Sequence, residues 1–226
     1  DRDSDLQLAE NLGCIGFKLE SGVLSRPDIV PQLLSTERTD TILRNTKETQ
    51  ISVALNLDNP AKTSIETGIG FFDHMLEQLA KHAEIAITLS CHGDTHIDEH
   101  HTVEDCAIAI GQALKQALGD KFGIARYGFS VPMDEASASV ILDISNRGYF
   151  KFDGRFERES VGTLPTELVP HFFQSLSEAA GFTVHMSVQG DNTHHMIEAC
   201  FKAFARVLKQ AIAQTGQSLP STKGVL

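Results

Sequence analysis

Tryptophan is absent from this chain of 226 residues, and only two of its residues are tyrosine. The sequence therefore offers no evident aromatic platform on which nucleic-acid bases could stack. Positive charge is also scarce, because 19 Lys and Arg residues stand against 30 Asp and Glu residues, for a formal net charge of −11. Nucleic-acid-binding proteins present basic faces to phosphates. We expect no nucleic-acid partner.

Long apolar runs and paired cysteines are missing too. No apolar run approaches the roughly 18 residues that a membrane-spanning helix requires, so we expect no membrane partner. The four cysteines are far apart and form no C-x-x-C motif. Scattered cysteines are typical of reduced, buried thiols, and we expect a cytoplasmic protein. The 41% hydrophobic share of the sequence favours a globular protein with a substantial core.

Two parts of the sequence are copies of one pattern. HHTVEDCAIAIGQALKQAL (100–118) aligns without a gap with HHMIEACFKAFARVLKQAI (194–212). A chance likeness of two amphipathic helices would not repeat so many features in one order, so self-similarity on this scale indicates a duplicated supersecondary unit. Upstream of each copy lie, in the same order, a helical pattern with a histidine, a strand-like alternation and a segment with a Gly-Asp pair. In the first copy these occupy 71–83, 84–91 and 91–94, and in the second 168–180, 182–189 and 188–191.

Each copy predicts strands, a helix, a strand, a Gly-Asp loop and a second helix. Two such units would place their helices on one face of their sheets. We therefore expect an α+β fold of two tandem pseudo-symmetric repeats, each a two-layer unit of a sheet plus helices.

The histidine pairs begin segments with helical periodicity. Residues three or four apart share a helix face, so His101 could hold an ion together with Glu104, and His195 could do so with Glu198. The first histidine of each pair points about 100° away from the second and need not serve the same ion. The apolar positions are 103, 106, 107, 110, 113, 114 and 117, and 197, 200, 201, 204, 207, 208 and 211.

Imidazole and carboxylate groups together are a ligand set for divalent transition metals. Histidines of the preceding helical segments would complete each set, and the first histidine of each pair would serve the other repeat's metal. Three histidines and one carboxylate leave positions open for substrate, which favours Mn²⁺ or Fe²⁺ over a closed structural zinc site. One pair alone would also fit a polar helix start. The predicted sets are His74, His101, Glu104 and His194 for site one, and His100, His171, His195 and Glu198 for site two.

Several motifs resemble those of the imidazoleglycerol-phosphate dehydratase family of histidine biosynthesis. They are RNTKETQI (44–51), TGIGFFDHML (67–76), DEHHTVED (98–105), MDEA (133–136), THHMIEA (193–199) and PSTKGVL (220–226). The resemblance implies a hydro-lyase that converts imidazoleglycerol phosphate to imidazole acetol phosphate with two Mn²⁺ per subunit. It also implies the ribosomal protein S5 domain 2-like fold and a homo-oligomer, expected as a 24-mer, with active sites between subunits.

The first residues carry a second resemblance. DRDSDLQLAENLG is similar to an acidic loop and helix near the end of a haloacid-dehalogenase-type phosphatase domain, which in some bacteria precedes the dehydratase. We therefore expect the C-terminal portion of a bifunctional enzyme, with an unrelated acidic extension as the alternative. The expected divisions are a phosphatase remnant (1–25), a linker (26–37) and a dehydratase domain (38–226), which comprises repeat one (about 38–128), repeat two (about 129–215) and a substrate-binding tail (216–226).

The resemblance also implies roles around the substrate. Glu48 is the candidate for proton transfer and joins the eight metal ligands in the predicted catalytic set, although an exposed acid at a strand edge would look the same. A substrate phosphate needs cationic and hydroxyl donors. The matching positions are Arg126, Arg147, Lys202, Ser221, Thr222 and Lys223.

Two positions depart from an expected pattern. Lys202 stands where the first repeat has Ile108, and this break in the duplication suggests that one copy is specialised for substrate. Asn146 stands where many relatives have glycine, which leaves the shape of the loop before Arg147 open.

Two other functions fit parts of the pattern. A dinuclear metallohydrolase acting on a phosphorylated small molecule would activate water between its metals, but it would favour bridging carboxylates over these histidine-rich sets. A non-catalytic metal-binding or assembly protein would have no use for the basic and hydroxyl residues of PSTKG. The dehydratase accounts for more of the sequence than either alternative.

Overall fold

The protein is described by a computed structural model that covers residues 37–129 and 132–226. Arg38–Leu226 form one compact unit. The phosphatase remnant expected at 1–25 and the linker expected at 26–37 lie, apart from Glu37, outside the described residues. Among the helices of the described ranges, none has the length and apolar character needed to span a bilayer.

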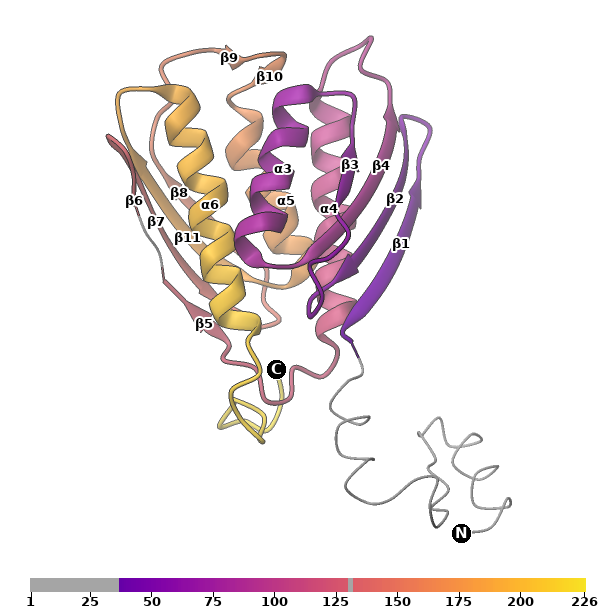
Figure 1. Ribbon diagram of the computed structural model, residues 1–226, viewed down its shortest axis with the longest axis vertical. Helices are drawn as coiled ribbons and strands as arrows, with labels where there is room; N and C mark the ends of the chain where they lie inside the picture. Colours follow the sequence, from indigo (N-terminus) through magenta and orange to yellow (C-terminus); the bar gives the residue numbers. More distant parts are fainter. Residues whose placement is uncertain (1–36, 130–131) are drawn as a thin grey trace. The chain divides into compact units, whose positions relative to one another are not determined.

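The unit contains two sheets with four helices between them (Figure 1). The first sheet has the order β1-β2-β4-β3, with β1 (Thr39–Asn45), β2 (Thr49–Asn56), β3 (Ser64–Glu66) and β4 (Ala86–Gly93). The second has the order β5-β7-β11-β8, and β6 also pairs with β7. Its strands are β5 (Tyr127–Gly128), β6 (Pro132–Met133), β7 (Ala136–Asp143), β8 (Tyr149–Asp153) and β11 (Thr183–Gln189). A small ribbon pairs β9 (Ser160–Val161) with β10 (Leu164–Pro165).

The helices confirm the predicted duplication. In repeat one, α3 precedes the last strand of its sheet and α4 follows it, and α5 and α6 stand in the same relation to β11 in repeat two. The α+β expectation of two sheet-plus-helix units is therefore confirmed. The helices are α3 (Gly70–Ala83), α4 (His100–Leu118), α5 (Leu168–Ala180) and α6 (Thr193–Ile212).

The central strand of each sheet forms because its apolar residues alternate. In β2, buried residues such as Val53, which is fully buried, alternate with residues that are partly or fully exposed. In β7, Val140 and Leu142 are fully buried while Ser139 and Ile141 face outward. Each sheet therefore has one face for helices.

The helices bury the stripe that their sequences predict. Every apolar position expected on α4 and α6 is buried, from Val103 to Ala117 and from Ile197 to Ala211. At the start of α6, the Asn192 side chain accepts a hydrogen bond of 2.9 Å from the backbone N–H of His194, which satisfies a free donor of the first turn. The histidine pairs are thus fixed at the first turn of a packed helix.

The two repeats exchange helix partners in the core. α4 of repeat one packs against α5 of repeat two, and α3 packs against α6. Phenylalanine rings fill the shared core: Phe72 of α3 and Phe201 of α6 lie 5.4 and 5.2 Å from the ring of Phe172 on α5. A site on α4 is therefore completed by residues of the other repeat.

All four helices begin at the same end of the unit, the upper end in Figure 1. The C-terminal residues lie at the opposite end, beyond the last turn of α6. At 1.5 Å per residue, the 20 residues of α6 separate the two ends by about 30 Å.

Candidate metal centre and active site

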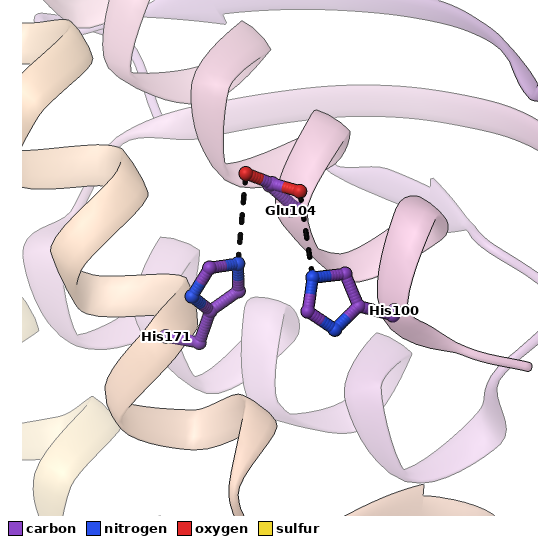
Figure 2. A group of neighbouring side chains, drawn as sticks. All are labelled: His100, Glu104 and His171. Carbon is purple, nitrogen blue, oxygen red and sulfur yellow. Dashed lines mark ion pairs between the residues drawn. The ribbon is translucent and has the colours of Figure 1, made fainter.

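Three of the predicted ligands meet where α4 packs on α5. His100 Nε2 lies 3.5 Å from one carboxylate oxygen of Glu104, and His171 Nε2 lies 3.6 Å from the other. Figure 2 shows both rings turned toward this carboxylate. One ligand atom from each residue lies within 4.8 Å of the others, and within the described ranges this is the only group of at least three such residues.

Local structure explains why these side chains converge. On a helix, residues four apart are offset by only about 40°, so His100 and Glu104 lie one above the other. The Asp98 carboxylate accepts a 2.8 Å hydrogen bond from the backbone N–H of His100 and holds the start of α4. The His171 ring lies 4.7 Å from that of His100, because α5 packs against α4.

The side-chain grouping around Glu104 differs from the one expected from sequence. We expected Glu104 to serve with His101, three residues away, but the structure places it with His100 and His171. A separation of three residues leaves an angular offset of about 60°, larger than the offset for four. His100 and His171, which the sequence assigned to one site, lie together, while within the described residues His74 and His194 do not join Glu104. Which of these residues bind a metal stays a prediction.

The equivalent residues of repeat two are only partly gathered. His194 Nε2 lies 3.6 Å from the Glu198 carboxylate, which repeats the i,i+4 geometry of α4. The Lys202 ammonium lies 2.7 Å from the other oxygen of Glu198. His74 is the counterpart of His171, but within the described ranges it is not part of a group as tight as that around Glu104.

The second histidine of each pair is held by an acid from a loop. His101 Nδ1 lies 3.2 and 3.0 Å from the carboxylate oxygens of Asp94, and His195 Nδ1 lies 3.0 and 2.9 Å from those of Glu135. These hydrogen bonds raise the pKa of both histidines and lower the pKa of Glu135. With Nδ1 donating to the acid, Nε2 is the nitrogen presented to a ligand.

The proton-transfer candidate stands beside the first of these histidines. Glu48 lies in the turn between β1 and β2, and its carboxylate is 3.9 Å from His101 Nε2. Its side chain is 51% exposed, so it remains accessible to a substrate.

The phosphate-binding candidates occupy two regions. Lys202 lies on α6, one turn below Glu198. Arg126 lies beside the last turn of α6, where its backbone N–H donates to the Ala211 carbonyl. Its guanidinium forms two hydrogen bonds to Asp143, of 2.5 and 3.0 Å, and donates to the carbonyl of Pro220 at 2.8 Å. Arg126 thus ties the tail to the end of β7.

The remaining candidates also lie away from the predicted metal ligands of their own chain. Arg147 is exposed in the loop after β7, and Asn146 before it has φ of 57°, a left-handed conformation that asparagine tolerates. The loop therefore keeps a shape that glycine would also allow. In the tail, the Ser221 hydroxyl donates to the Val225 carbonyl at 2.7 Å, while Thr222 and Lys223 are exposed.

Sequence reasoning assigned no role to Asp94 or Glu135. Asp94 belongs to the Gly-Asp pair of the repeat, but its counterpart Asp191 is not the acid that holds His195. Glu135 precedes β7 directly, just as Glu48 precedes β2, so the repeat alignment carried to this position could have indicated it.

Comparison with known proteins shows which family shares this sequence pattern. A family profile for imidazoleglycerol-phosphate dehydratase matches residues 67–208. The chain is 55% identical to the "Histidine biosynthesis bifunctional protein HisB" of Stenotrophomonas maltophilia strain K279a and 52% identical to that of Xylella fastidiosa strain M23. Each alignment covers the whole of this chain, which spans 64% and 66% of the two relatives.

Solved structures match over most of the chain. The crystal structure of imidazoleglycerol-phosphate dehydratase from Staphylococcus aureus is 38% identical, with a TM-score of 0.72 over 78% of this chain and 99% of that one. The corresponding enzyme from Pyrococcus furiosus, in complex with (S)-C348, is 33% identical, with a TM-score of 0.71 over 82% of this chain and all of that one.

Proposed function

The chain belongs to the imidazoleglycerol-phosphate dehydratase family, hydro-lyases of histidine biosynthesis, and from that premise we propose that it is a manganese-dependent enzyme with two metals per chain. The proposed reaction removes water from imidazoleglycerol phosphate and yields imidazole acetol phosphate, in the cytoplasm. The observation that carries the proposal is the convergence of His100, Glu104 and His171 at one point.

These three residues fit a divalent ion. His171 Nε2 is buried and has no hydrogen-bond partner, although it lies 3.6 Å from a Glu104 oxygen. That distance is too long for a hydrogen bond, but a first-row ion with ligand distances of about 2.0–2.2 Å would occupy such a gap. Two imidazoles and a carboxylate suit Mn²⁺ with positions left for substrate.

Pseudo-symmetry supports a second site. His194 and Glu198 repeat the spacing of His100 and Glu104, and His74 has the place in α3 that His171 has in α5. His101 and His195 would then complete sites on neighbouring copies, because acids engage their Nδ1 atoms and leave Nε2 as the ligand nitrogen. We therefore propose a homo-oligomer, with a 24-mer as the expected assembly.

The reaction is difficult because the hydrogen to be removed is on a carbon that is not next to a carbonyl group, so this hydrogen is not acidic. When bound, the two metals would supply Lewis acidity toward the imidazole of the substrate. Glu48, beside His101 Nε2, would take the proton from the substrate carbon. Lys202, one turn from Glu198, would hold the phosphate through a charge-assisted hydrogen bond.

The position of the tail supports active sites shared between copies. Ser221, Thr222 and Lys223 lie at the opposite end of α6 from His194, about 30 Å away by helix length. Tail donors, with Arg126 and Arg147, would therefore serve the phosphate of a neighbouring copy. The relatives are named bifunctional, and the resemblance of residues 1–13 to a haloacid-dehalogenase-type phosphatase leads us to propose that this chain is the C-terminal part of a bifunctional enzyme with a phosphatase activity.

Turnover of imidazoleglycerol phosphate by the Mn²⁺-loaded chain tests the proposal, with the ketone product followed by NMR. We expect turnover that a chelator abolishes, a loss of at least about 100-fold in Glu104→Gln, and near-wild-type activity in the control Glu178→Gln on the exposed face of α5. Release of inorganic phosphate without ketone would instead support the metallohydrolase.

A further inference from the structure

A buried carboxylate lies beneath the turn that carries Glu48. Asp105 follows Glu104 on α4 and is only 7% exposed. One of its oxygens accepts hydrogen bonds of 2.9 and 2.6 Å from the guanidinium of Arg44, and the other accepts one of 2.5 Å from the Thr49 hydroxyl. Arg44 and Thr49 flank the turn, so both of its ends are bound to the helix that bears the metal ligands.

The turn itself is fixed through its backbone. The Thr46 hydroxyl accepts hydrogen bonds from the backbone N–H groups of Glu48, at 3.1 Å, and Thr49, at 2.9 Å. The Glu48 carbonyl accepts a 3.0 Å bond from the backbone N–H of Asp94. No side-chain hydrogen bond of Glu48 takes part in this anchoring, which leaves its carboxylate available to the substrate.

The second repeat lacks this anchor. Alignment of the histidine pairs places Ala199 opposite Asp105, and alignment of the first residues of β2 and β7 places Ala136 opposite Thr49. Both polar partners are thus replaced by alanine together. Glu135 takes the place of Glu48, but its carboxylate is occupied by His195.

The two acids at equivalent positions are therefore held by different means. Glu135 is fixed through its own carboxylate, which orients a histidine. Glu48 is fixed through its backbone and neighbours, and Asp94 orients His101 in its place. The Glu48 carboxylate therefore lies 3.9 Å from His101 Nε2 without a hydrogen bond to that ring, whereas the Glu135 carboxylate is hydrogen-bonded to His195.

We propose that Asp105 is a positioning residue that, through Thr49 and Arg44, sets the Glu48 carboxylate for proton transfer. This inference rests on the proposed function, because it presumes that Glu48 acts on the substrate. Asp105 contacts neither substrate nor metal in the proposal. Asp105 affects the rate only indirectly, because it holds the turn that carries Glu48.

The test is a double-mutant cycle on the Mn²⁺-loaded chain. Thr49→Val removes the hydroxyl that binds Asp105 and keeps the side-chain volume. We expect kcat to fall about 10–100-fold, with KM and metal content near wild type, because a misplaced catalytic group slows the chemical step. Thr49→Ser should restore kcat, since it restores the hydroxyl.

In a Glu48→Gln background, Thr49→Val should lower kcat no further, because residues that act through one group are not additive. The matched control is Thr102→Val on α4: the Thr102 hydroxyl is also buried but has no hydrogen-bond partner in the structure. We expect the kcat of this variant to stay within about twofold of wild type. Additive losses in the cycle, or an unchanged kcat in Thr49→Val, would overturn the proposal.

Hydrogen exchange separates this inference from the proposed function. Thr49→Val should speed exchange of the Glu48 and Thr49 amides, which the turn protects, whether or not the chain turns over its substrate. A wild-type chain without turnover would refute the proposed function, while unchanged amide exchange in Thr49→Val would refute the anchor.

Discussion

Gly111→Ala tests whether helix packing sets the metal centre. Gly111 lies on α4 at the contact with α5, two turns below Glu104. An added Cβ would lie 2.7 Å from both the Ala179 Cβ and the Leu176 carbonyl oxygen, and 3.1 Å from the Ala180 backbone nitrogen. Two of these three atoms belong to the backbone of α5, so a change of rotamer cannot relieve the overlap.

The expected magnitude follows from this geometry. Ordinary contact begins at 3.4 Å, so the helices must separate by about 0.7 Å at this point. Overpacking costs about 1–3 kcal/mol, against a gain of about 1 kcal/mol from replacing glycine within a helix. The net loss of about 1 kcal/mol would lower the melting temperature by about 2–4 °C in a domain of this size.

The separation should also weaken metal binding. His171 is on α5 while His100 and Glu104 are on α4, and a metal tolerates ligand displacements of only about 0.2 Å. We expect the dissociation constant for Mn²⁺ at this site to rise about tenfold, a size typical of a disturbed ligand support. Isothermal titration calorimetry and thermal unfolding would measure the two effects.

Gly70→Ala is the matched control, because Gly70 also lies in a helix and an added Cβ there would meet no atom within 4 Å. It should keep the metal affinity of the wild type, with a melting temperature equal to or slightly above the wild-type value. If Gly111→Ala also kept the wild-type melting temperature and Mn²⁺ affinity, the claim that the α4–α5 contact positions His171 would be refuted.

Three further changes probe other contacts of the structure. Lys202→Met should keep the metal content but lower kcat/KM about 10–100-fold and weaken inhibition by free phosphate, since a charge-assisted hydrogen bond contributes roughly 1.5–3 kcal/mol; loss of metal with unchanged phosphate inhibition would contradict this role. Glu135→Gln should weaken Mn²⁺ binding about 10–100-fold by releasing His195, which a metal titration would detect. Arg38 lowers the pKa of Asp58, mainly through a side-chain hydrogen bond, so the ion pair stabilises the fold fully above the ordinary carboxyl pKa of 3.8 and progressively less as pH falls toward the lowered pKa. Arg38→Ala should therefore lower the melting temperature more at pH 7 than at pH 3, and an equal loss at both would contradict the linkage.

The sequence predicted the elements whose pattern is local. The apolar stripes of α4 and α6 are buried as expected because helical periodicity determines which face can leave water. The duplication was also visible, since the two histidine pairs lie in the same order with the same neighbours. These features depend on spacing along the chain, which a sequence records directly.

The grouping of the candidate ligands depends on tertiary contacts, so the sequence predicted it less well than it predicted the helices. Spacing alone allowed either histidine of the first pair to lie beside Glu104, and the packing of α5 against α4 brings His171 to the group of His100 and Glu104. Asp94 and Glu135 come from loops whose positions no periodicity reports. The two metals, the manganese and the assembly stay predictions.

Metal stoichiometry measured together with turnover is the most direct test of the two-metal dehydratase. Metal-depleted protein would be titrated with Mn²⁺, and bound metal and ketone formation from imidazoleglycerol phosphate would be measured on the same samples. The account predicts that turnover reaches its plateau at two equivalents of Mn²⁺ per chain. Full turnover with one equivalent, or no turnover with two equivalents bound, would contradict it.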